Sequence, residues 1–242
     1  MFVLGIETSG LDGSIALLRG HECLGERALN QTGRRHAQAL VLDIGELLTA
    51  QGLTARDLAS VAVSRGPGSF TGLRVGMVCA KTLAYATGCQ FISVDTFQAI
   101  AENVPRQIER VTVVEDAQRD DLFAGDYQRL PTGEWQMVSP IQIVSVEDFL
   151  RDHAQRVVVG PGLKKLDADQ IASHWLTAPE MSQPRAAVIA SLGHHLLTSA
   201  SDAGRAHDSD FWKASPFYLR MSAAEEKRAI DDAAKATSGL AK

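Results

Sequence analysis

A glycine-rich block that leads directly into a helical pattern constrains this chain more than any other feature. The expected helix is Leu73–Thr87, ending at Gly88, and the block before it reads Ser64-Arg65-Gly66-Pro67-Gly68-Ser69-Phe70-Thr71-Gly72-Leu73-Arg74. Such a turn can bind a phosphate through free amide groups and the helix dipole. The glycine spacing is one residue too long for a dinucleotide fingerprint, and the Lys-Ser/Thr of a P-loop is missing. A tight turn with Ser69 or Thr71 capping the helix is the simpler interpretation.

The same helix carries small residues at four-residue intervals: Gly72, Gly76, Ala80 and Ala84. Each glycine inside a helix costs about 1 kcal/mol relative to alanine. Close approach of another helix would offset this cost. The periodicity leaves open whether that helix belongs to this chain, as His36–Ala50 does, or to another chain.

Strands alternate with helices in the first hundred residues, which favours an α/β fold. Strands are expected at Phe2–Thr8, Ser14–Leu18, about His21–Leu29, Val61–Ser64 and Phe91–Val94, with helices at His36–Ala50 and Phe97–Asn103. After Pro105, strands are expected at Val111–Val114, Leu122–Tyr127, Trp135–Val144 and Arg156–Val159, with helices at Val146–His153 and Arg185–Ala200. We predict an N-terminal lobe (1–104), a C-terminal lobe (105–221) and a helical or frayed tail (222–242).

Composition excludes several classes of protein. The chain has 242 residues, of which 45% are hydrophobic and 22% charged, as in ordinary globular proteins. The net charge of −5 argues against a broadly basic nucleic-acid binder. Cys23, Cys79 and Cys89 are widely spaced, so neither a disulfide framework nor a zinc cluster fits. Because the sequence shows neither a signal-peptide pattern nor a membrane-spanning run, we expect a soluble, cytoplasmic protein.

Motifs for catalysis are scarce. None of the seven histidines forms a His-x-x-x-His pair, so no metal site is expected. Ser/His/Asp chemistry lacks the Gly-x-Ser-x-Gly element. Glu7-Thr8-Ser9 follows a strand and could face a nucleotide phosphate or form hairpin hydrogen bonds, and both interpretations stay open.

Several segments taken together resemble one family. They are Leu4-Gly5-Ile6-Glu7-Thr8-Ser9, Arg35-His36-Ala37, the block from Gly66 to Gly76, Ala80-Lys81-Thr82-Leu83-Ala84 and Pro216-Phe217-Tyr218-Leu219-Arg220. They are similar to the bacterial TsaB (YeaZ) proteins, the non-catalytic subunit of the machinery that makes threonylcarbamoyladenosine (t6A) at position 37 of tRNAs reading ANN codons. The resemblance is strongest in the first hundred residues and thins through Val111–Thr177.

The resemblance implies a two-lobed actin-like ATPase (ASKHA) fold without catalysis by this chain. In the related catalytic subunit TsaD, a His-x-x-x-His pair holds a metal, whereas His36 here is followed four residues later by Leu40. Glu7 replaces the usual aspartate of the first phosphate motif, and Gln118 departs from the second-lobe motif that begins at Asp116. No cofactor is expected on this chain; ATP and metal are expected on partner subunits. The candidate nucleotide-cleft residues are Glu7, Thr8, Ser9, Asp116, Gly160 and Gly162.

In the family, two N-lobe helices contact TsaD, or a second copy when TsaD is absent. The interface residues implied here are His36, Ala37, Leu40, Val41, Ile44, Leu47, Gly72, Leu73, Gly76, Ala80 and Leu83. The small residues would permit close approach of the partner's helices, and the leucines and isoleucine would supply apolar burial. The TsaE ATPase is expected to join the complex. This chain would meet tRNA only indirectly, through the complex, and no membrane is expected as a partner.

Two other functions stay open. The chain could be an active actin-like ATP-dependent phosphotransferase or a homologue of the M22-type peptidases. Alternatively, it could bind tRNA directly through Arg34 and Arg35, which the acidic net charge disfavours.

Overall fold

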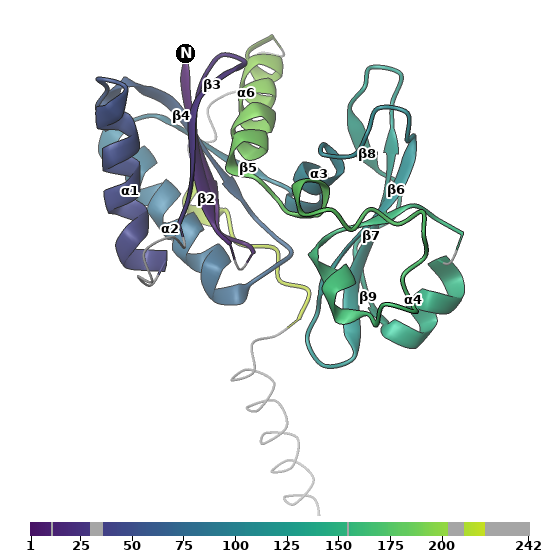
Figure 1. Cartoon of the computed structure of the whole chain (residues 1–242). Helices are drawn as coiled ribbons and strands as arrows, with labels where there is room; N and C mark the ends of the chain where they lie inside the picture. The colour runs from purple at the N-terminus through teal and green to yellow at the C-terminus, as the bar shows by residue number, and fades with distance from the viewer. Residues whose placement is uncertain (11, 30–35, 154, 203–210, 221–242) are drawn as a thin grey trace, which may run out of the picture.

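The chain folds into two α/β lobes, each built on a five-stranded sheet (Figure 1). The computed structural model describes all residues except 11, 30–35, 154, 203–210 and 221–242. The predicted tail and the pair Arg34-Arg35 lie outside the described residues, as do the side chains of 36–39 and 200–202. The predicted two-lobed α/β architecture is confirmed.

The first sheet has the strand order β3-β2-β1-β4-β5. Its strands are β1 (Phe2–Glu7), β2 (Ser14–Arg19), β3 (Glu22–Ala28), β4 (Leu58–Ser64) and β5 (Gln90–Val94). The strands β1, β2 and β3 form an antiparallel meander, whereas β4 and β5 run parallel to β1. The hairpin predicted for the first two strands is confirmed, with Phe2 opposite Arg19 and Glu7 opposite Ser14.

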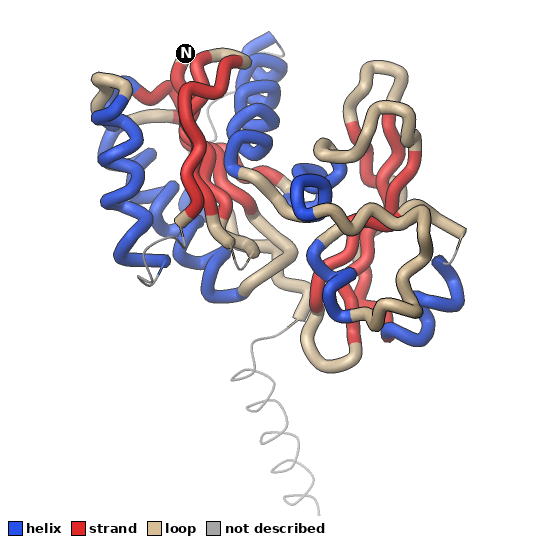
Figure 2. The backbone as a smooth tube through the Cα atoms, in the orientation of Figure 1, coloured by secondary structure: helices blue, strands red, loops and turns tan. Residues whose placement is uncertain are grey.

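Helices cover both faces of the first sheet (Figure 2). The helices α1 (His36–Ala50) and α2 (Phe70–Thr87) lie on one face, and α6 (Ala186–Asp202) lies on the other. Since both faces are covered, the strands β1 and β4 are buried along almost their whole length.

The ends of α2 follow from local chemistry. Ser69 caps the helix by accepting a hydrogen bond from the backbone N–H of Gly72, at 3.2 Å, so α2 begins three residues before the predicted start. Gly88 ends it in the left-handed region, with φ of 75°, as predicted.

The second sheet has the order β10-β6-β7-β8, and β9 also pairs with β7. Its strands are β6 (Arg110–Asp116), β7 (Asp121–Arg129), β8 (Trp135–Met137), β9 (Gln142–Ser145) and β10 (Val158–Val159). Around it lie α3 (Thr96–Ala101), α4 (Val146–His153), α5 (Pro179–Ser182) and the 3-10 helix η2 (Pro161–Lys165). Two further 3-10 helices are η1 (Ala55–Asp57) and η3 (Phe211–Lys213). The single strand predicted for Trp135–Val144 is wrong, because the segment forms two strands, β8 and β9, that both pair with β7. Pro140 lies between them and has no N–H to donate to a neighbouring strand.

The two lobes are not consecutive halves of the sequence. Helix α3 precedes residue 104 but packs its Phe97 and Ile100 into the core of the second sheet. Helix α6 follows the second sheet in sequence, yet its Ile189 packs against the first sheet. The lobes therefore do not divide between residues 104 and 105, as predicted. Helix α3, before this point, covers the second sheet, and helix α6, after it, covers the first.

Candidate functional site: a helical groove and an interlobe cleft

The small-residue stripe of α2 faces the sheet of its own lobe. A Cβ atom added to Gly72 would overlap the backbone carbonyl oxygen of Thr8, and one added to Gly76 would overlap the Thr8 hydroxyl. Ala80 is fully buried in the same core. The prediction that these residues let a partner's helices approach is therefore wrong, because Thr8 of the same chain already occupies the space beside Gly72 and Gly76.

Of the apolar residues predicted to contact a partner, most are buried in the core of this chain and a minority are exposed. Leu40, Ile44 and Leu47 are 1%, 4% and 3% exposed and belong to the core of the first lobe, as does Leu73. Val41 is 66% exposed, and Leu83 is partly buried. The backbone of His36 and Ala37 begins α1, but their side chains lie outside the described residues.

Between α1 and α2 the first lobe has an open apolar groove of about 770 Å³. Four predicted interface residues line it: Leu40, Val41, Ile44 and Leu83. The sequence analysis missed other lining residues, among them Leu53, Val75 and Val78, the last of which is 63% exposed. Arg74 is the charged residue of this lining, and no carboxylate contributes to it. Val75, Cys79 and Leu83 follow one another at four-residue intervals and all line the groove. This spacing marks a second apolar face of α2 that the sequence could have shown.

A second concave site lies between the lobes, with a volume of about 650 Å³. The first lobe contributes the loop Ser9–Gly10 and the start of α2 at Ser69–Thr71. The second lobe contributes the end of β6 and the turn after it, Glu115–Gln118, together with Lys164 and Lys165. The cleft is therefore lined by groups of both charge signs, unlike the groove.

The first nucleotide-cleft candidates, Glu7-Thr8-Ser9, mostly bond to one another and to α2. The Glu7 carboxylate accepts hydrogen bonds from the backbone N–H and the hydroxyl of Ser9, and burial raises its pKa. Thr8 is buried against Gly76, so its hydroxyl faces α2. Ser9 belongs to the lining of the cleft, whereas Glu7 and Thr8 do not. The hairpin interpretation thus accounts for the Glu7–Ser9 contacts.

Of the nucleotide-cleft candidates in the second lobe, one lines the cleft and two do not. Asp116 lines the cleft, where its carboxylate pairs with Lys165 at 2.6 Å. Gly160 and Gly162 instead let the chain pass close to β6: a Cβ on Gly160 would overlap the carbonyl of Val114, and one on Gly162 would lie 2.9 Å from Glu115 backbone atoms. Nucleotide binding in this cleft stays a prediction.

Glu115 is a cleft residue that the sequence analysis did not single out. Burial raises its pKa to about 7, and the negative charges of Asp116 and Glu7 act in the same direction. Its position at the end of the buried strand β6, beside Asp116, is the signal that could have found it.

Within the part of the chain that the structure describes, no three His, Cys, Asp or Glu side chains are grouped to hold a metal ion. Cys23, Cys79 and Cys89 are free, and burial raises the pKa of Cys79 to about 11. Among the described helices, none has the length and apolar character that crossing a bilayer requires.

Comparison with known proteins places these features in a family. Residues 22–185 match the family described as "TsaD: tRNA N6-adenosine threonylcarbamoyltransferase". The chain is 31% identical over 150 residues to the tRNA threonylcarbamoyladenosine biosynthesis protein TsaB of Bacillus subtilis, covering 62% of this chain and 65% of that protein. It is 30% identical over 172 residues to TsaB of Haemophilus influenzae, covering 65% and 72%. The chain thus spans about two thirds of the length of these relatives.

Among solved structures, YeaZ from Pseudomonas aeruginosa superposes with a TM-score of 0.70 at 26% identity. The superposition covers 90% of this chain and 99% of the other. The similarity therefore extends over both lobes, including the region in which the sequence resemblance thins. This agreement confirms the predicted fold class.

Proposed function

This chain belongs to the TsaB (YeaZ) family, and we propose that it is a scaffold without catalytic activity of its own. In this proposal it binds and stabilises TsaD for threonylcarbamoyl transfer to adenosine 37 of tRNAs that read ANN codons. The observation that carries the proposal is the apolar groove between α1 and α2 of the first lobe.

The groove has the character of a protein-binding surface. Val41 and Val78, one from each helix, are more than half exposed on its walls. The floor is formed by side chains that already belong to the core, such as Leu40 and Ile44, so the surface is rigid before a partner binds. An apolar surface of this kind on a soluble chain favours association with another protein. A pair of helices from TsaD, or from a second copy of this chain when TsaD is absent, would cover it.

Two features support a role without catalysis. Leu40, which stands four residues after His36, is an apolar core residue and offers no metal ligand. Glu7, in the first phosphate motif, is held by Ser9 and is not part of the cleft lining. In the proposal, the TsaE ATPase joins the assembly, partner subunits carry ATP and metal, and tRNA binds to the complex.

Substitution on the wall of the groove tests the docking surface. We expect Val78→Asp to weaken TsaD binding by about 100-fold or more, as for a central interface residue, because it buries a charge in the interface. Titration calorimetry measures the affinity, and thermal unfolding should change little because Val78 is exposed. The matched control is Val138→Asp, an exposed valine of the second lobe, which should bind as the wild type does. Equal affinity of both variants for TsaD would contradict the assignment of the groove.

Reconstitution tests the scaffold role itself. Purified TsaD and TsaE are incubated with tRNA, ATP and a threonylcarbamoyl donor, with and without this chain. The t6A that forms is quantified by mass spectrometry. We expect modification to depend on the chain and to fail with Val78→Asp. Full activity without the chain would overturn the proposal. ATP hydrolysis by the isolated chain, lost in Asp116→Ala, would favour the phosphotransferase instead.

A further inference from the structure

The C-terminal segment Phe211–Arg220 crosses from the first lobe to the second along the cleft (Figure 1). The covalent chain crosses between the lobes at the β5–α3 junction and again between α5 and α6. This segment makes a further crossing, held by hydrogen bonds, ring contacts and one ion pair. Its last residues, Phe217–Arg220, form part of the lining of the cleft.

The first end of the segment is fixed to α2. The Lys81 ammonium donates to the carbonyl oxygens of Trp212 and Ala214, at 2.9 and 2.5 Å. Further along, the Arg74 guanidinium donates to the Tyr218 hydroxyl at 3.0 Å, and the ring of Phe70 packs on Tyr218 with centroids 4.8 Å apart.

The backbone of the segment also bonds to the glycine-rich block. The Phe217 N–H donates to the carbonyl of Arg65 at 2.7 Å. Four residues of the segment, Trp212, Ala214, Phe217 and Tyr218, therefore bond to α2 or to the block before it.

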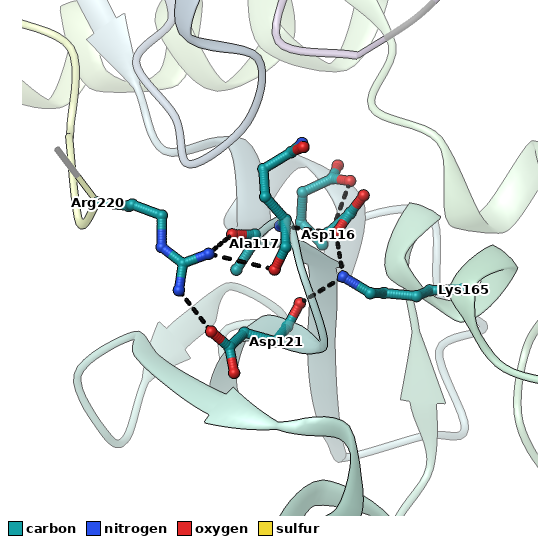
Figure 3. Close-up of polar contacts among 7 residues, drawn as sticks. Asp116, Ala117, Asp121, Lys165 and Arg220 are labelled. Atoms are coloured by element: carbon teal, nitrogen blue, oxygen red, sulfur yellow. Dashed lines mark hydrogen bonds and ion pairs between the residues drawn. The ribbon is translucent and has the colours of Figure 1, made fainter. Parts of the chain in front are cut away.

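The second end is fixed to the turn between β6 and β7. The Arg220 guanidinium donates to the carbonyl oxygens of Ala117 and Gln118 and forms an ion pair with Asp121. Figure 3 shows Arg220 and Lys165 reaching this turn from opposite sides. Leu219 packs against the apolar core of the second lobe.

This turn has a backbone that needs support. Gln118 and Arg119 have φ of 69° and 54°, in the left-handed region that residues other than glycine seldom adopt. Two such residues in succession are unfavourable, so the turn depends on contacts that hold its carbonyl groups in place. Arg220 supplies two of these contacts from outside the lobe's own strands.

We propose that Phe211–Arg220 is a clasp that holds the two lobes together across the cleft, with Arg220 as its closing contact. When the clasp is closed, it sets the width of the cleft and the conformation of the 117–121 turn. When Arg220 leaves, the turn loses two carbonyl partners and the lobes lose one of the contacts that join them across the cleft. Since the clasp lies on α2, it also connects the cleft with the helix that lines the groove.

Hydrogen exchange of the full chain tests the clasp. We expect Arg220→Met to raise amide exchange in the 117–121 turn by about tenfold or more, while α2 keeps its protection. Small-angle scattering should show a larger radius of gyration as the cleft opens. The control is Ser215→Ala, an exposed position of the same segment, which should leave both measurements unchanged. Unchanged exchange in the turn of Arg220→Met would overturn the proposal.

The wild-type chain provides a second test that needs no substitution. If the clasp closes as a unit, the amides of residues 217–220 and of the 117–121 turn open together, with the same dependence on denaturant. Lys81→Met, which loosens the other end, should raise exchange in both segments. A turn that stays protected while residues 217–220 exchange freely would show that the clasp does not support it, and the proposal would fail.

Discussion

The two lobes fill their cores in different ways. The buried cluster beneath α1 and α2 contains aliphatic side chains and one methionine, and α2 comes so close to β1 that Gly72 has no room for a methyl group. The core of the second lobe combines aliphatic side chains with six aromatic ones: Phe97, Phe123, Tyr127, Trp135, Phe149 and Trp175. The packing of the first lobe is therefore tested by adding volume at α2, and that of the second by removing an aromatic ring.

The largest expected effect is on the close layer of the first lobe. Gly72→Ala would push a methyl group into the carbonyl of Thr8, which directly follows the central strand β1, is buried and cannot yield easily. We expect a loss of at least about 4 kcal/mol in the free energy of unfolding, measured by urea denaturation. On the other helix, a Cβ added to Gly45 meets open space. Gly45→Ala should therefore stabilise the chain by about 1 kcal/mol. A Gly72→Ala variant as stable as wild type would refute the close packing.

The next effect concerns the aromatic core of the second lobe. Phe149 is fully buried on α4, with its ring 5.9 Å from that of Trp175. Phe149→Ala leaves a cavity and should lower the free energy of unfolding by about 3–5 kcal/mol. Phe149→Leu, which keeps most of the volume, should lose much less. Because the groove lies on the other lobe, TsaD affinity at a temperature where the variant stays folded should be unchanged. A small loss for Phe149→Ala would remove the contrast between the lobes.

The smallest effect distinguishes the charged cleft from the apolar groove. The pKa of Glu115 is raised by burial to about 7 from an ordinary 4.5, so the folded chain holds this proton more tightly than the unfolded chain does. The resulting stabilisation is complete below about pH 4.5 and is lost as the pH rises through about 7. Glu115→Gln removes the charged form, so its stability relative to wild type should rise by about 3 kcal/mol between about pH 4 and pH 8.

Glu147→Gln, at an exposed position of the same lobe, is the control for this titration. Chemical denaturation at a series of pH values gives both curves. If Glu115→Gln and wild type keep a constant difference across the range, the cleft does not hold Glu115 in its neutral form.

Much of the local structure was predictable because it depends on neighbours in the sequence. The bounds of α1 and α4 agree with the prediction, and Gly88 ends α2 where a left-handed residue was expected. The split of the predicted strand at Pro140 was missed because the apolar pattern runs through it. Lys81, Arg74 and Arg220 were quoted only as parts of motifs, since their partners lie more than ninety residues away in the sequence.

The candidate site was half predictable for a similar reason. Both helices of the groove, and Val41 among its residues, followed from periodicity and resemblance. Which face of each helix points into the core did not follow from the sequence. Gly72 and Gly76 were therefore assigned to the partner interface. The same small side chain permits close approach of a strand from this chain or of a helix from another, and spacing along the helix is identical in both cases.

By itself, the sequence determined the long helices, most strands, the glycine-rich turn and the family, because these depend on local propensity and on motifs contiguous in the chain. Only the tertiary structure decided which face of α2 is buried, that α6 returns to the first sheet, and that Arg220 meets the 117–121 turn. These outcomes depend on which surfaces remain uncovered once both sheets have formed, and that is settled by contacts between residues distant in the sequence.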